Sequence, residues 1–212
     1  MNSIQTAPAL EQEGNFFEIL EGIGKKRFYP KNAIILNEGD PSSFLYLINS
    51  GRIKVYLSDE QGHEIVLNIM EEGEYFGEMA LMDNRARSAS VMTLENSQLT
   101  LISKEDFDKC LSDHPELISS LILGLIGKIR NANKKIGSLA LMDVYGRVAS
   151  ALLQLAREHQ GRLVIEKKPT HQEIANLVGA SREMVSRIMH YLAEGGYISY
   201  DEKKRIILNE RP

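Results

Sequence analysis

Residues 115–141 read PELISSLILGLIGKIRNANKKIGSLAL and indicate one long helix between two unlike halves of the chain. Their apolar side chains recur at alternating intervals of four and three residues, which is the spacing of a coiled-coil seam rather than of an ordinary core helix. We therefore predict a dimerisation helix; the alternative is a long interdomain helix that packs only on its own chain. The residues of this seam are Ile118, Ile122, Leu125, Ile129, Ala132, Ile136 and Leu139.

The composition is that of an ordinary globular protein, with 43% hydrophobic and 25% charged residues in a chain of 212. One cysteine, Cys110, excludes an internal disulfide framework and any cluster that needs several thiolate ligands. The first 14 residues lack the basic and then apolar layout of a secretion signal. The most apolar run, residues 117–126, is too short for the ~20 residues of a membrane span. We expect a cytoplasmic protein with no membrane partner.

The charge is distributed unevenly along the chain, although the overall balance is only −4. From Val144 onward there are 11 Lys and Arg against 8 Asp and Glu, a balance of +3. The preceding part has 14 against 21, a balance of −7. Because affinity for nucleic acid depends on the charge of the domain that binds it, the C-terminal part is the better candidate to face phosphate.

Short strands separated by turn residues dominate the chain before the long helix. Glycines at 39, 51, 62 and 73 supply turns at intervals of 11 or 12 residues, which is typical of an antiparallel barrel or sandwich. Ser103, with the acidic residues Glu105 and Asp106 in the turn that follows it, predicts the start of a helix after the last strand. The predicted strands are residues 33–36, 44–48, 51–57, 64–70 and 98–102.

The segment FGEMALMDNRARSAS, residues 76–90, breaks this rhythm of strands. Gly77 opens what reads as a single helical turn, whose first backbone N–H groups would be free to face an anion. Arg87 and Ser88 would add a planar cation and a hydroxyl, whereas Glu78 is suited to accept hydrogen bonds from sugar hydroxyls. Together they predict a ribose-phosphate site. The alternative is a surface turn with a salt bridge between Arg87 and Glu78.

Residues 76–90 resemble the phosphate-binding cassette of cyclic-nucleotide-binding domains, and we call them the cassette. From about Phe28 onward the chain resembles the cyclic-AMP receptor protein (CRP/FNR) family of bacterial transcription regulators, whose turn positions match the glycines at 39, 51, 62, 73 and 77. The resemblance implies that Glu78 holds the ribose 2′-OH and that Arg87 and Ser88 hold the cyclic phosphate. It also implies backbone contacts from Gly77, Met79 and Ala80, and places Leu67 and Asn68 on a strand that borders the nucleotide.

The chain departs from the family pattern at the base end of this site. Family members that respond to cyclic AMP have two adjacent hydroxyl residues on the long helix, where this chain has Ala132 and Asn133. Ala132 cannot form a hydrogen bond through its side chain. Asn133 offers both a donor and an acceptor and could satisfy an adenine or a guanine edge. The resemblance implies a cyclic nucleotide effector, with cyclic AMP as our first choice and a guanine nucleotide as the alternative.

Residues 170–192 have the pattern of a helix-turn-helix. Thr170 and Glu173 form a capping box for a first helix that ends at Gly179, and Ser181 caps a second helix. Two strands, residues 197–200 and 205–208, would form a wing with the basic tip Lys203–Lys204 between them. The apolar residues that would join the two helices are Ala175, Val178, Val185 and Ile188.

The polar residues of this motif predict DNA binding. Arg182, Glu183, Ser186 and Arg187 lie on the solvent side of the second helix, which in such motifs enters the major groove. Thr170, His171 and Ser181, at helix starts, are suited to backbone phosphates. By resemblance, the two arginines and the glutamate would read a TGTGA-like half-site. The alternative is a three-helix scaffold with incidental arginines.

No other chemistry finds support in the sequence. The five histidines lack metal-ligand spacing, and Gly127-Lys128 is not followed by the Ser or Thr of a phosphate-binding loop. We predict no enzyme activity, no catalytic residues and no metal site.

The predicted fold class is α+β. Residues 1–114 form an N-terminal arm and a cyclic-nucleotide-binding β-roll (a double-stranded β-helix or jelly roll), residues 115–143 a dimerisation helix and hinge, and residues 144–212 a winged helix-turn-helix. The predicted protein is a homodimer that binds a palindromic DNA operator, acts with RNA polymerase and is controlled allosterically by the nucleotide. Two alternatives remain open: a DNA-binding regulator with no nucleotide effector or with cyclic GMP or cyclic di-GMP, and a nucleotide-binding subunit that acts on a protein.

Overall fold

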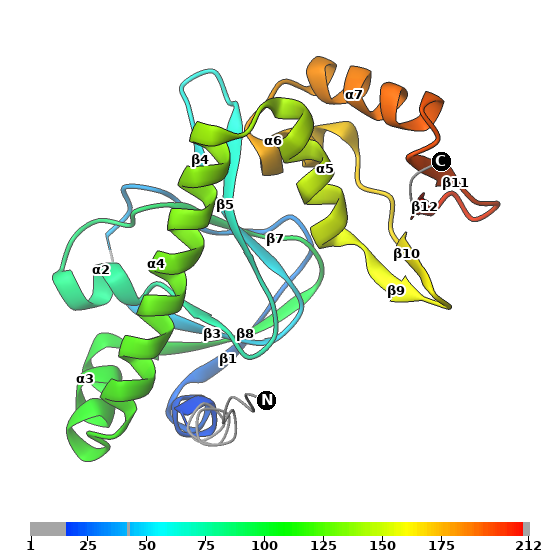
Figure 1. Cartoon of the computed structure of the whole chain (residues 1–212). Helices are drawn as coiled ribbons and strands as arrows, with labels where there is room; N and C mark the ends of the chain where they lie inside the picture. Colours follow the sequence, from blue (N-terminus) through cyan, green and yellow to red (C-terminus); the bar gives the residue numbers. More distant parts are fainter. Residues whose placement is uncertain (1–15, 42, 210–212) are drawn as a thin grey trace, which may run out of the picture. The chain divides into compact units, whose positions relative to one another are not determined.

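A computed structural model describes residues 16–41 and 43–209 (Figure 1). The predictions made for the first 14 residues lie outside these ranges. The described chain forms two compact units. The first unit consists of two segments, the chain up to Leu57 and residues Leu67–Asn131. The second unit consists of Ser58–Val66 and the chain from Ala132 onward. Each unit is described by itself below.

The first unit is built on antiparallel strands, as the spaced glycines predicted. One four-stranded sheet has the order β1-β8-β3-β6 and another has the order β2-β7-β4-β5. The predicted turn glycines at 39, 51, 62 and 73 all have φ between 81° and 95°, a region that glycine adopts without steric cost. The strands are β1 (Lys25–Tyr29), β2 (Ile34–Leu36), β3 (Phe44–Ser50), β4 (Ile53–Ser58), β5 (Glu64–Met70), β6 (Tyr75–Phe76), β7 (Ser90–Thr93) and β8 (Ser97–Ser103).

Strand β3 shows how the apolar pattern builds this unit. Its successive side chains point to opposite faces of the sheet, and both faces are covered. Leu45 and Leu47 join a core cluster made with helical residues, whereas Tyr46 and Ile48 join a second cluster made with the other sheet. A strand buried on both faces reads as a continuous apolar run, which is the sequence FLYLI.

Three helices, α2, α3 and α4, follow strand β6 in the described chain. Helix α2 (Glu78–Asp83) lies in the cassette, and α3 (Lys104–Asp113) begins after Ser103, whose side chain accepts a hydrogen bond from the Asp106 amide as the sequence predicted. Helix α4 (Leu117–Leu141) follows and continues into the second unit. Residues 16–23 are also helical.

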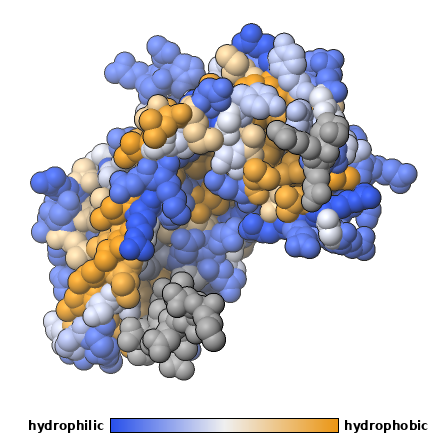
Figure 2. All heavy atoms as spheres, in the orientation of Figure 1, coloured by the Kyte–Doolittle hydropathy of each residue, from blue (hydrophilic) through white to orange (hydrophobic). Residues whose placement is uncertain are grey.

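Helix α4 has two different faces. Leu117 and Leu121 are buried in the core of the first unit, and Gly124 lies against the Tyr75 ring, so that an added Cβ atom would overlap the Tyr75 hydroxyl. The seam lies on another face and stays largely exposed in the single chain, with Ile129 60% and Ile136 62% exposed. Figure 2 shows apolar residues gathered along this helix. Over residues 117–131 the helix therefore packs on its own chain through a face other than the seam.

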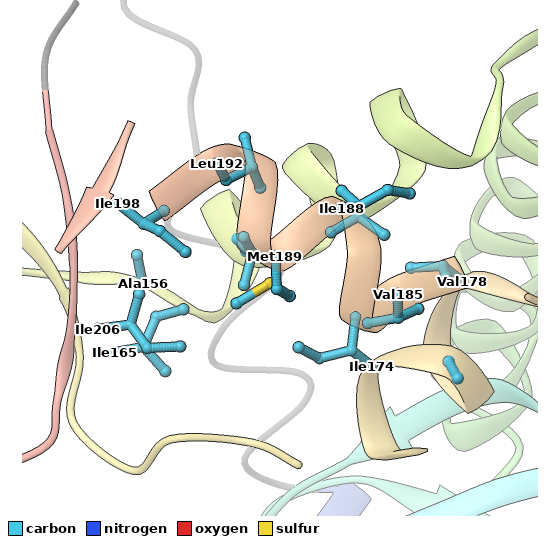
Figure 3. Close-up of a cluster of buried hydrophobic side chains, with 13 residues drawn as sticks. Ala156, Ile165, Ile174, Val178, Val185, Ile188, Met189, Leu192, Ile198 and Ile206 are labelled. Atoms are coloured by element: carbon cyan, nitrogen blue, oxygen red, sulfur yellow. The ribbon is translucent and has the colours of Figure 1, made fainter. Parts of the chain in front are cut away.

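The second unit contains the predicted helix-turn-helix and a larger sheet than predicted. Its core joins all three helices to the sheet and includes Val148. Figure 3 shows Ile174, Val185 and Ile206 among the side chains of this cluster. The predicted two-stranded wing is part of a four-stranded sheet of order β11-β12-β10-β9, because β10 pairs with β12. The elements are α5 (Val144–Leu155), β9 (Arg157–His159), β10 (Arg162–Ile165), α6 (His171–Val178), α7 (Arg182–Glu194), β11 (Ile198–Tyr200) and β12 (Ile206–Leu208).

Candidate functional site: a nucleotide cassette and a DNA-reading helix

The cassette buries two opposite charges. Glu78 is 2% exposed and Arg87 is 4% exposed, so neither is the solvated surface group that the salt-bridge alternative required. Gly77 precedes α2 with φ of 88°, and a Cβ atom at this position would lie 2.7 Å from Nη1 of Arg87. Gly77 is therefore needed both for the backbone turn and for the close approach of the arginine.

Backbone carbonyls hold the guanidinium of Arg87 from two sides. Nη1 donates to the Gly77 carbonyl and Nη2 to the Phe44 carbonyl, each at 2.8 Å, and Cζ lies 5.9 Å from the centre of the Tyr46 ring. Burial lowers the pKa of Arg87 from its ordinary value, against the opposing effects of Tyr46 and Glu78. Nε is buried and has no hydrogen-bond partner among the described residues. An unpartnered charged donor of this kind is well suited to an anion.

Glu78 pairs with a lysine from α4 rather than with Arg87. Nζ of Lys128 lies 2.8 Å from Oε1 of Glu78, donates to the Tyr75 carbonyl at 2.8 Å and lies 4.3 Å from the centre of the Tyr75 ring. The sequence interpretation missed Lys128. It could have been found from the inward face of α4, where Leu117, Leu121, Gly124 and Lys128 follow one another at helical spacing.

The other predicted nucleotide residues lie in several environments. Met79 and Ala80 follow Glu78 in the first turn of α2, and Met79 is exposed whereas Ala80 is buried. Ser88 is exposed beside the buried Arg87. The remaining residues are Leu67 and Asn68, exposed and half-buried on β5, and Ala132 and Asn133, both exposed on α4 where the second unit begins.

The helix-turn-helix has the predicted caps. The Thr170 hydroxyl accepts a hydrogen bond from the Glu173 amide at 3.1 Å, and the Glu173 carboxylate accepts one from the Thr170 amide at 2.6 Å. These two hydrogen bonds form the capping box. Helix α6 ends at Gly179, with φ of 65°, and the Ser181 hydroxyl accepts from the Met184 amide at the start of α7. The four apolar residues predicted to join the helices are all buried.

Polar side chains form an exposed surface on the first two turns of α7. Arg182, Glu183, Ser186 and Arg187 are exposed and line one open hollow. Both arginines can offer planar pairs of donors, and Glu183 offers acceptors, so the surface can read base edges in a major groove. Thr170 and Ser181 lie at the starts of α6 and α7, and His171, at the first position of α6, is half-buried.

The fold and these two surfaces define a class of protein, a DNA-binding regulator with a ligand-sensing domain. Comparison with protein families matches residues 26–114 to the cyclic nucleotide-binding domain and residues 146–212 to the Crp-like helix-turn-helix domain. The chain belongs to the CRP family of cyclic nucleotide-binding transcription regulators.

Relatives are similar over most of their length. The chain is 36% identical to the cyclic AMP receptor protein of Thermus thermophilus over 82% of this chain and 79% of the relative. It is 31% identical to the cAMP-activated global transcriptional regulator CRP of Escherichia coli, over 86% of this chain and 89% of the relative. Among solved structures, the c-di-GMP-responsive global regulator CLP of Xanthomonas campestris is similar with a TM-score of 0.83 at 26% identity, over 93% and 99%.

These relatives are transcription regulators rather than enzymes, in agreement with the sequence prediction. Within residues 16–41 and 43–209, no group of three or more His, Cys, Asp or Glu side chains could hold a metal ion. In the same ranges, no helix combines the length and apolar character needed to cross a membrane.

Proposed function

We propose that the chain is a homodimeric, sequence-specific DNA-binding regulator controlled allosterically by a cyclic nucleotide, most simply cyclic AMP. The observation that carries the proposal is Arg87, a buried cation with an unpartnered Nε beside a second buried charge, Glu78. In function, residues 1–114 would sense the nucleotide, residues 115–143 would dimerise and transmit, and residues 144–212 would bind DNA.

The phosphate end of the nucleotide would bind to Arg87 and Ser88. A cyclic phosphate carries a negative charge and acceptor oxygens, which Nε of Arg87 and the Ser88 hydroxyl can satisfy. Gly77, Met79 and Ala80 would contribute backbone contacts. Because the guanidinium is already fixed by two carbonyls, binding would lose little side-chain entropy.

The ribose would bind to Glu78, which gives a direct connection to α4. The Glu78 carboxylate holds Nζ of Lys128, so a ribose hydroxyl that donates to Glu78 would change the environment of Lys128. A ligand shifts a conformational equilibrium only by contacts that differ between the two states, and this ion pair would be such a contact. The change would pass along α4 to a hinge near residues 141–144.

Arg87 and Ser88 match the family pattern at the phosphate end of the site, whereas Ala132 and Asn133 depart from it at the base end. Support for cyclic AMP comes from the names of the relatives, which describe cyclic AMP receptors. Leu67 and Asn68 would border the base, and Ala132 with Asn133 would face it. The similarity to a c-di-GMP-responsive regulator favours cyclic di-GMP as the second candidate.

A second copy of the chain would cover the seam. Its residues have heptad spacing and project from a helix whose other face is already packed, so a parallel α4 could bury them. Each fully buried Ile or Leu would contribute about 1.5–3 kcal/mol. Ile129→Glu should give a monomer in sedimentation velocity, because two carboxylates would face each other in the seam. Asn131→Glu, on an exposed neighbouring position outside the seam, should leave the dimer intact.

A dimer would present two α7 helices to a palindromic operator with TGTGA-like half-sites, roughly 34 Å apart. Arg182, Glu183, Ser186 and Arg187 would read bases, whereas Thr170, His171 and Ser181 would contact phosphates. RNA polymerase would be the further partner. If the chain acted on a protein partner instead, alanine at Arg182 and Arg187 would leave its regulatory output intact.

Two measurements test the proposal. Titration calorimetry with cyclic AMP, cyclic GMP and cyclic di-GMP should show binding of cyclic AMP that Arg87→Ala abolishes. A flat trace for all three at micromolar protein would contradict nucleotide control, and heat from cyclic di-GMP alone would favour the second candidate. A gel shift on a TGTGA-type palindrome, with and without each nucleotide and at stated salt, then tests operator binding.

A further inference from the structure

The turn between α6 and α7 determines where the DNA-reading helix points. Only Ala180 separates Gly179, at the end of α6, from Ser181, the cap of α7. The last carbonyls of a helix have no partner within the helix and carry its negative end charge. Whatever binds these carbonyls therefore fixes the turn and the direction in which α7 leaves it.

Two cationic side chains bind three consecutive carbonyls at this helix end. Nζ of Lys135, on α4, donates to the Leu177 carbonyl. Arg147, on α5, donates from Nε to the Val178 carbonyl at 2.8 Å and from Nη2 to the Gly179 carbonyl at 3.3 Å. Nη1 of Arg147 also donates to the Met142 carbonyl, at 2.9 Å, in the hinge after α4. The turn is thus held by the helix that precedes the hinge and by the helix that follows it.

The tip of the β4–β5 hairpin holds the same turn from another side. Residues Ser58–Val66 belong to the second compact unit together with α6 and α7. Nδ2 of Asn176 donates to Oε2 of Glu64 at 2.8 Å, and Ile65 and Leu139 each lie 3.2 Å from the position that a Cβ atom of Gly179 would occupy. The Asn176 side chain also accepts from Gln172, so both ends of its amide are engaged.

We infer that Glu64 and Lys135 are positioning residues for operator recognition, because they secure the α6–α7 turn to the hairpin tip and to α4. We call Glu64, Lys135 and Arg147 the turn clamp. Arg147 belongs to the same helical domain as α7, whereas Glu64 and Lys135 come from the segments before the hinge. The inference rests on the proposed dimer. In such a dimer the clamp would fix the two α7 helices relative to the paired α4 helices, and so favour simultaneous binding of both half-sites.

Partial burial of the charged Lys135 ammonium group costs free energy, and this cost favours a positioning role for the residue. Burial, and secondarily the neighbouring Arg147, lower the pKa of Lys135 from its ordinary value. An exposed lysine would avoid this cost, and Lys134 beside it is exposed. The carbonyl of Leu177 offsets part of the cost by accepting from the ammonium group.

The test compares binding to a palindrome with binding to a single half-site. Lys135→Met and Glu64→Ala should weaken binding to the palindromic duplex by about 10-fold or more, because a loose α7 lowers the effective concentration of the second contact. Binding to a duplex with one half-site, and binding of the nucleotide, should stay within about twofold of the parent. Lys134→Met removes the same charge from the neighbouring position and should behave like the parent. Glu64→Gln, which keeps an acceptor for Asn176, should also behave like the parent.

Hydrogen exchange provides a readout that needs no DNA. Backbone amides of residues 176–181 should exchange faster in Lys135→Met and Glu64→Ala than in Lys134→Met, because the turn would open more often. Unchanged exchange in both variants would overturn the inference, and so would equal losses on the palindrome and the half-site. If the parent chain itself bound the palindrome no better than the half-site, the proposed dimer function would fail, whereas the exchange result would still decide the clamp.

Discussion

The cassette and the recognition surface both use arginine and glutamate, but they place these residues in opposite environments. In the cassette, Arg87 and Glu78 are almost fully buried and held by carbonyls and by Lys128. On α7, Arg182 and Glu183 are exposed. Buried charges contribute to folding as well as to binding, since their loss leaves partners unsatisfied. Exposed charges cost little until DNA arrives. Mutations in the cassette should therefore lower both stability and nucleotide affinity, whereas mutations on α7 should lower DNA affinity alone.

Among single substitutions, the largest expected effect is that of Arg87→Ala. The change removes two charge-assisted hydrogen bonds, to the Gly77 and Phe44 carbonyls, and the proposed donor for the phosphate. We expect nucleotide affinity to fall by at least about 100-fold and the free energy of unfolding to fall by roughly 1–3 kcal/mol. Titration calorimetry and urea unfolding measure the two quantities. A variant as stable as the parent would show that the guanidinium contributes to binding alone and would break the comparison.

Alanine at Arg182 or Arg187 should affect DNA binding alone. Each loss of a bidentate base contact should cost about 1–3 kcal/mol of operator affinity and relax specificity at one base pair. The free energy of unfolding should change by less than about 0.5 kcal/mol, because both side chains are exposed. Fluorescence anisotropy with operator variants measures the first quantity, and urea unfolding measures the second. A large loss of stability would contradict the distinction drawn between the two surfaces.

Gly77→Ala should separate backbone strain from crowding of the arginine. At Gly77 a methyl group would meet Nη1 of Arg87, whereas at Gly73, with a similar φ of 85°, nothing lies within 4 Å. Both alanine variants should lose roughly 1 kcal/mol of stability from strain. Only Gly77→Ala should also reduce nucleotide affinity, by about 10-fold, because Arg87 must move. Equal nucleotide affinity in the two variants would mean that the guanidinium position is unimportant for binding.

The smallest expected effect is that of salt on nucleotide affinity at the cassette. Between 50 and 200 mM salt, nucleotide affinity should change by less than about threefold, since buried charges are poorly screened. Operator affinity should fall by roughly 10³–10⁵ over the same range if six to ten phosphates are contacted. Parallel titrations at four salt concentrations give both slopes. Similar slopes would indicate that the nucleotide phosphate binds at a solvated surface rather than beside Arg87.

Local signals in the sequence were sufficient for much of this fold. The turn glycines, the Ser103 cap and the capping box at Thr170 were all predicted, because each depends on a few adjacent residues. Strand β1 was missed: its sequence KKRFY is charged and mostly exposed, and only pairing with β8 makes it a strand. Strand β6 was missed because it has only two residues.

The candidate site was predicted in its residue types but not in its contacts. The resemblance predicts Glu78 and Arg87 as nucleotide-binding residues, whereas two of the groups that hold them, Lys128 and the Phe44 carbonyl, come from elements distant in the sequence. The contact between Glu64 and Asn176 spans 112 residues and has no local signature. Periodicity describes one element at a time, so it cannot give such pairs.

The unpartnered Nε of Arg87 has a consequence for the lifetime of the protein in the cell. A buried donor without an acceptor lowers the stability of the folded chain, and an anion that binds it returns that free energy. A ligand that binds only the folded state at 100 times its Kd stabilises it by about 2.7 kcal/mol. Because proteases remove chains that unfold, an effector bound at Arg87 would raise the amount of regulator as well as its activity. Nucleotide concentration and protein turnover would then be linked through one nitrogen atom.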